Sequence, residues 1–141
     1  MKLNCVEVSN SARIFQFFEI VNTEFSPPLG ERVNLAVYAN KLAERAVNLF
    51  MVEDDRDIAH AAFYCNDQHS KVAYISSIAV LPEFHGSGIA GNLLVKVVDR
   101  CLSEGMRLLN LEVDVKNLKA AKFYEKYGFR FVSDKIMQKK L

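Results

Sequence analysis

Hydrophobic and polar residues follow one another in blocks whose period changes along the chain. Alternation over residues 3–8 predicts a short strand, and cap-type polar residues at 9–11 precede an apolar stripe of helical period over 14–21. Two prolines and a glycine within 26–30 end this helix, and a second helical period follows over 35–42. The first third therefore predicts a strand, a helix, a loop and a second helix.

The middle of the chain has the pattern of strands. Apolar runs at 48–52 and 58–65 are separated by the polar turn 53–57, and a third apolar run follows at 72–81. Short polar turns between consecutive strands favour antiparallel pairing of neighbours. These residues therefore predict a meander of three antiparallel strands.

After this meander the apolar period becomes helical. One helical face is apolar through 89–102, and Gly105 stands where a C-terminal cap belongs. A strand is expected at 108–115, a short helix at 118–127 and a last strand at 129–137. Because a strand–helix–strand crossover is right-handed and parallel, we expect an α+β fold in three layers, with a mixed, mostly antiparallel sheet flanked by helices.

Composition and charge narrow the function. The chain has 141 residues, of which 50% are hydrophobic and 25% charged, as in one globular domain spanning 1–141. A net charge of +1 provides no broad field for nucleic acid or for an anionic membrane, so we expect neither as a partner. No apolar run approaches the roughly 20 residues that span a bilayer. The three widely spaced cysteines have apolar neighbours, as buried thiols do in a reducing compartment, so we expect a cytoplasmic protein.

A glycine-rich turn, residues 86–91 (GSGIAG), joins the third strand of the meander to the clearest helix. Unpaired amides and the positive end of the helix dipole make such a turn a site for phosphate or pyrophosphate. Glycine permits a positive φ and lets an anion approach the backbone closely. The alternative is that the glycines only form a tight strand-to-helix turn.

Two nucleotide-binding motifs share this glycine spacing. A P-loop needs Lys and Ser or Thr where this chain has Asn92 and Leu93, which excludes nucleotide hydrolysis. The dinucleotide fingerprint fits the three glycines, and Glu112 or Asp114 lies at the distance expected of a ribose-binding acid. The antiparallel strands before the turn and the short chain after it weigh against a NAD-binding redox protein.

Two segments carry a resemblance to a known family. Residues 78–90 resemble motif A of the GNAT superfamily of acetyl-CoA-dependent N-acetyltransferases, whose core is Arg/Gln-x-x-Gly-x-Gly/Ala. Residues 117–124 and 128–129 resemble its motif B in residue type and spacing. The first core position is His85 rather than Arg or Gln, and its shorter side chain is expected to lose a hydrogen bond near the cofactor or the turn.

The resemblance implies a GNAT-like sheet in which the parallel strand pair splays apart, with acetyl-CoA as the co-substrate in the split. Amides of the turn would hold the CoA pyrophosphate, and two residues of the preceding strand would pair with the pantetheine arm through their main chain. The cofactor contacts implied in this way are Ile78, Ala79, Val80, His85, Gly86, Ser87, Gly88, Ile89, Ala90, Gly91, Asn117, Ala120 and Tyr124.

Acetyl transfer to a neutral amine needs a proton donor for the thiolate, a donor for the oxyanion and a base. Tyr124 matches the family position of the general acid, although its ring also suits the buried face of a short helix. A main-chain N–H within 78–80 is the natural oxyanion donor. Where some relatives carry a catalytic Glu, this chain offers Tyr74, Ser76 and Ser77, so a water chain or an acid of the early loop must serve.

The acceptor site is expected beside the proline-containing loop. Glu24 and Glu31 flank that loop, and Arg32 could pair with an acidic substrate, although solvated surface roles are the alternative for all three. Glu112 alternates with apolar neighbours on its strand and is not predicted to be the base. The expected acceptor-binding residues are Glu31, Arg32, Tyr74 and Ser76.

The sequence thus predicts an N-acetyltransferase that moves the acetyl group of acetyl-CoA directly to a primary amine of a small molecule or of a protein. A non-catalytic module that binds or senses acyl-CoA is the main alternative. The three histidines have no partners at metal-ligand spacing, so we expect no metal. Exposed apolar residues of the last strand favour a homodimer over a monomer.

Overall fold

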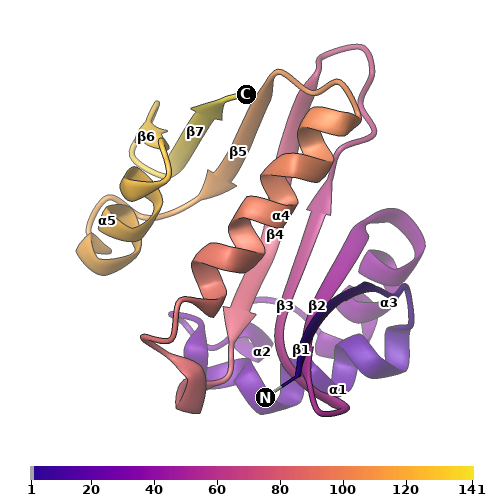
Figure 1. Ribbon diagram of the computed structural model, residues 1–141. Coiled ribbons are helices and arrows are strands. Elements are labelled where there is room, and N and C mark those ends of the chain that lie inside the picture. Colours follow the sequence, from indigo (N-terminus) through magenta and orange to yellow (C-terminus); the bar gives the residue numbers. More distant parts are fainter. Residues whose placement is uncertain (1) are drawn as a thin grey trace.

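The computed structural model describes residues 2–141 and contains one seven-stranded sheet between two layers of helices (Figure 1). The strands lie in the order β1-β2-β3-β4-β5-β7-β6, and every neighbouring pair is antiparallel except β4 and β5. The predicted fold class is confirmed. The elements are β1 (Leu3–Glu7), α1 (Ser11–Val21), η1 (Asn22–Glu24), α2 (Leu29–Arg32), α3 (Leu35–Arg45), β2 (Val47–Glu53), β3 (Arg56–Tyr64), β4 (Val72–Val80), η2 (Pro82–Phe84), α4 (Ile89–Ser103), β5 (Leu108–Glu112), α5 (Leu118–Lys126), β6 (Arg130–Phe131) and β7 (Ile136–Lys140).

Asparagine side chains fix where three helices begin. Asn10, Asn34 and Asn117 are the N-caps of α1, α3 and α5, and each side-chain oxygen accepts a hydrogen bond from the amide three residues further on. Each bond satisfies one of the amides that a helix leaves free in its first turn. None of the helices within residues 2–141 combines the length and the hydropathy that a membrane crossing needs.

The core includes one histidine that the sequence left without a role. His60 is 1% exposed, its Nε2 lies 3.0 Å from Asn48 Oδ1, and its ring packs between Phe17, Phe18 and Phe50. Burial lowers the pKa of His60 to about 3, because the charged imidazolium would lose its hydration. His60 is therefore a neutral core residue that joins β3 to the helices on this face.

β4 and β5 separate along their length. They pair only from Val72 to Ile75 on β4, opposite 108–111 on β5. Between β3 and β4 the register shifts at Ala62 and Phe63, which leaves Ser76 as an extra residue on β4. Such a β-bulge bends a strand and increases its twist. Beyond the bulge, the edge of β4 that faces β5 has no strand partner in the described structure, and a cleft can form there.

The end of the chain differs from the prediction. A single strand was expected over 129–137, but the structure has a hairpin of β6 and β7, and β5 ends at Glu112 instead of 115. The turn forms because Ser133 Oγ accepts hydrogen bonds from the amides of Lys135 and Ile136, at 3.3 and 3.1 Å. Serine at a turn commonly makes this kind of bond, which interrupts a strand ladder.

Candidate functional site

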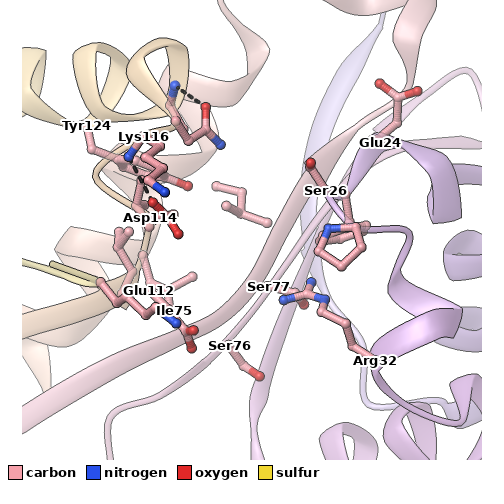
Figure 2. Close-up of a pocket in the computed structure, with 18 of the residues that line it drawn as sticks. Glu24, Ser26, Arg32, Ile75, Ser76, Ser77, Glu112, Asp114, Lys116 and Tyr124 are labelled. Carbon is pink, nitrogen blue, oxygen red and sulfur yellow. Dashed lines mark hydrogen bonds between the residues drawn. The ribbon is translucent and has the colours of Figure 1, made fainter.

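A cavity of about 790 Å³ opens where β4 and β5 diverge. Figure 2 shows Glu112, Asp114 and Tyr124 on one wall and Glu24 and Arg32 on the other. The first wall is built by the end of β5 and by α5, and the second by η1 and α2, with β4 between them. Of the site residues predicted from the sequence, those lining the cavity are Arg32, Tyr74, Ser76, Ile78, Asn117, Ala120 and Tyr124.

The other selected residues lie outside the cavity lining. Glu31 is exposed on α2, and residues 79–80 and 85–91 continue from the end of β4 into the glycine-rich turn. The turn borders the cavity, because His85 Nε2 lies 3.4 Å from Oε1 of Glu24 on the cavity wall. The two groups of selected residues therefore form neighbouring parts of one region.

The free edge of β4 presents main-chain groups to the cleft. Leu81 N donates to Ile58 O on β3 at 2.9 Å, so the alternation of an antiparallel ladder turns the main-chain groups of Ile78 and Val80 away from β3. The carbonyl of Val80 accepts a hydrogen bond from His85 Nε2 at 3.0 Å. His85 thus keeps a bond to the strand although it is shorter than Arg or Gln, and the N–H of Ile78 remains directed at the cavity.

The glycine-rich turn has the backbone shape of an anion cradle. Gly86 and Gly88 have φ of +79° and +85°, and a Cβ added to either would meet no atom within 4 Å. Within residues 2–141 no hydrogen bond uses the amides of Gly86, Gly88, Ile89 or Ala90. Positive φ and open space over free amides at a helix N-terminus suit a phosphate group.

Gly91 is required for a different reason, the packing of α4 on α5. A Cβ on Gly91 would lie 1.8 Å from the hydroxyl oxygen of Tyr127, the residue that caps α5. The glycine therefore admits the tyrosine hydroxyl against the first turn of α4. The tight packed turn therefore explains Gly91, whereas the open space at Gly86 and Gly88 is compatible with the predicted phosphate cradle.

Tyr124 has a buried ring and a free hydroxyl. It is 9% exposed, and its ring packs edge-on against Phe123 and Phe129, with centroids 5.1 and 5.6 Å apart. No group in the described part of the chain forms a hydrogen bond with its hydroxyl, and the residue lines the cavity. Burial raises the pKa of Tyr124, since the phenolate would lose its hydration. Tyr124 therefore remains a protonated donor beside the cavity.

Three carboxylates line the cavity, and two of them are engaged. Glu24 faces His85, and Asp114 Oδ1 accepts from the amide of Lys116 at 2.9 Å. Glu112 has no hydrogen-bond or ion-pair partner among residues 2–141. The sequence did not predict that Glu112 is a free carboxylate at the cavity, because the face of β5 on which Glu112 lies depends on the strand register.

That register places Glu112 on the same face as the β4 tyrosine. Tyr74 pairs with Asn110 across the parallel ladder, and alternation brings Asn110 and Glu112 to one side of β5. Burial raises the pKa of Tyr74, and the negative charge of Glu112 raises it further. On the same face, the hydroxyls of Tyr38 and Ser76 share a hydrogen bond that joins α3 to the bulge.

Comparison with known proteins identifies the family. The model of the acetyltransferase (GNAT) family matches residues 14–129, which run from within α1 past the end of α5 and include every residue lining the cavity except Lys135. The chain belongs to the acetyltransferase (GNAT) family. GNAT membership places it among the N-acetyltransferases, a class of acyltransferase enzymes, as the two motifs predicted.

Curated GNAT relatives match parts of the chain. GCN5-related N-acetyltransferase 4 of Arabidopsis thaliana, a chloroplastic protein, is 38% identical over 61 residues, which are 43% of this chain and 21% of that protein. The ribosomal protein bS18-alanine N-acetyltransferase of Haemophilus influenzae is 35% identical over 94 residues, 66% of this chain and 61% of that protein. The chain thus spans less than two thirds of either relative.

Solved GNAT structures share the whole fold. The ribosomal-protein-S18-alanine N-acetyltransferase of Escherichia coli superposes with a TM-score of 0.80 at 20% identity, covering 99% of this chain and 94% of that one. The PaiA N-acetyltransferase of Thermoplasma acidophilum, solved in complex with coenzyme A, has a TM-score of 0.75 at 16% identity and full coverage of both chains. At these identities the likeness concerns the fold.

Proposed function

We propose that this GNAT protein transfers the acetyl group of acetyl-CoA to a primary amine of a small molecule or of a protein. The observation that carries the proposal is the cavity between β4 and β5, because the free Ile78 amide and the protonated Tyr124 both border it. Names of matching proteins give support, since one relative is called an alanine N-acetyltransferase of a ribosomal protein.

The chain's residues fit coenzyme A at the glycine-rich turn. Gly86 and Gly88 leave open the space that a Cβ would occupy, and the free amides of the turn would hold the pyrophosphate. Ile78 and Val80 would pair with the pantetheine arm, Val80 through its amide because His85 occupies its carbonyl. Two similar folds were crystallised with coenzyme A or acetyl-CoA, which supports this assignment.

Each chemical need of the transfer has a group at the cavity. Acetyl-CoA supplies an activated acyl carbon; the acceptor nitrogen forms a bond to it and the carbon–sulfur bond breaks. Glu112 takes the proton that the amine releases, the amide of Ile78 donates to the thioester oxygen, and Tyr124 gives its proton to the departing sulfur. We propose Glu112 as the base in place of the water chain or the acid of the early loop that the sequence suggested.

Replacing Glu112 with glutamine tests the proposed base. The amide cannot accept the amine proton, so kcat should fall about 10²-fold while the affinity for acetyl-CoA stays unchanged. Steady-state thiol release measures the first quantity and calorimetric titration the second. Glu125→Gln, an exposed change on α5 away from the cavity, is the matched control and should keep full activity. Equal rates in Glu112→Gln and the wild-type protein would show that another group takes the proton.

Calorimetric titration with acetyl-CoA and with NAD distinguishes a glycine-rich turn that binds coenzyme A from one that binds a dinucleotide. We expect a binding isotherm for acetyl-CoA and none for NAD, followed by acetyl-CoA-dependent thiol release when amines are added. Binding of NAD alone would overturn the proposal. Binding of acetyl-CoA without acetylation of any amine would favour the non-catalytic acyl-CoA-binding module instead.

A further inference from the structure

The acceptor side of the cavity contains a cation without a counter-ion. Arg32 lines the cavity from the end of α2, and no carboxylate in residues 2–141 lies within ion-pair distance of it. Its guanidinium carbon lies 5.9 Å from the ring of Phe25, which leaves the fork of N–H donors available. By contrast, Arg13 binds Asp57 through two N–H groups at 2.8 and 2.6 Å.

Arg32 faces an unpaired anion across the cavity, whereas the two other cations of the lining, Lys116 and Lys135, are not among the residues of the η1 and α2 wall. Figure 2 shows Arg32 on the wall formed by α2 and Glu112 on the wall formed by β5. Both charges act on the Tyr74 hydroxyl, since Glu112 raises the pKa of Tyr74 and Arg32 lowers it. The two charged groups therefore act on one space, the space above the polar face of β4.

A polar side chain on that face also has no partner. Ser77 is 6% exposed and lines the cavity, and its hydroxyl forms no hydrogen bond with any group in the described chain. A buried hydroxyl without a partner is unfavourable, so a bound group that forms a hydrogen bond with it is stabilised. The register puts Ser77 opposite Ala62 and two positions from Ala79, which pairs with His60, so it faces the layer of α1 to α3 to which Arg32 belongs.

We propose that the acceptor amine carries a carboxylate, which Arg32 binds while Glu112 receives the amine, with Ser77 as a further donor on the carboxylate side. This inference rests on the proposed acetyl transfer and names its substrate class. Guanidinium and carboxylate match in a bidentate geometry that no neutral amide reproduces. The carboxylate belongs either to a free amino acid or to an acidic side chain next to the amino terminus of a peptide.

Matched acceptors test the inference directly. The panel pairs 4-aminobutyrate with 4-aminobutyramide, and a Gly-Asp-Gly peptide amide with its Gly-Asn-Gly counterpart, and adds 1,4-diaminobutane; thiol release gives kcat/KM for each. We expect the carboxylate member of at least one pair to be favoured about 10-fold or more. The pair that shows the preference identifies the source, a free amino acid or a peptide.

Variants of Arg32 assign the preference to this residue. In Arg32→Gln the preference should disappear, chiefly through the KM of the carboxylate acceptor, and in Arg32→Glu the diamine should become the better acceptor. Arg130→Gln, an exposed change on β6 outside the cavity lining, should keep the wild-type preference. Equal use of carboxylate and carboxamide by the wild-type protein, or an unchanged preference in Arg32→Gln, would overturn the inference while leaving acetyl transfer intact. If no amine is acetylated, the proposed function itself fails.

Discussion

Replacing Tyr124 with phenylalanine should lower kcat about 10²-fold or more, with the affinity for acetyl-CoA unchanged. The ring stays in place, because its packing against Phe123 and Phe129 does not involve the hydroxyl. The variant lacks the hydroxyl that is proposed to give its proton to the departing sulfur. Since burial raises the pKa of Tyr124, the wild-type donor keeps its proton as the pH rises past the ordinary tyrosine value near 10. Single-turnover acetyl transfer in the wild type and the variant measures the effect.

A matched control separates chemistry from packing. Tyr64 is also a tyrosine whose hydroxyl has no hydrogen-bond partner, but it lies on β3 outside the cavity lining. Tyr64→Phe should therefore keep the wild-type turnover. Turnover near the wild-type value in Tyr124→Phe would remove Tyr124 from the mechanism and leave it as a packing residue of α5.

Gly88→Val should abolish measurable acetyl-CoA binding. Gly88 has φ of +85°, and the space around its missing Cβ is empty. Valine would put branched methyls into the volume that the pyrophosphate is expected to occupy, beside the free amides of Ile89 and Ala90. Titration calorimetry at increasing protein concentration would measure the loss, and we expect about 10²-fold weaker binding or none, which corresponds to about 2.7 kcal/mol or more.

The chain provides its own control for backbone strain. Gly105, beyond the other end of α4, has φ of +80° and equally empty surroundings. A side chain in left-handed conformation costs about 1–2 kcal/mol, so Gly105→Val should lower the free energy of unfolding by an amount similar to Gly88→Val. Only Gly88→Val should lose acetyl-CoA. An equal loss of affinity in both variants would mean that strain, and not the cradle, explains the result.

The sequence predicted α4 and the turn before it well, because a long apolar stripe of helical period and a cluster of glycines both act locally. It missed the hairpin of β6 and β7, since apolar residues on both sides of the polar segment 133–135 were assigned to one strand, whereas the hydrogen bonds of Ser133 and of Val132 N to Ile136 O form a turn there. The position of Glu112 at the cavity could not be predicted for a different reason. A residue on a half-buried strand faces either side with equal ease until its pairing partner is known.

The separation of β4 and β5 is held at both ends. At one end the two strands pair from Val72 to Ile75, and at the other the hydroxyl of Tyr127 rests in the space that Gly91 leaves on α4. The width of the cleft is thus set by strand pairing and side-chain packing before any ligand enters. A ligand that enters such a cleft loses its own freedom, but it does not have to order the protein as well. Because of this preorganisation, little of the binding free energy of the acetyl donor and the amine is lost in ordering this chain of 141 residues.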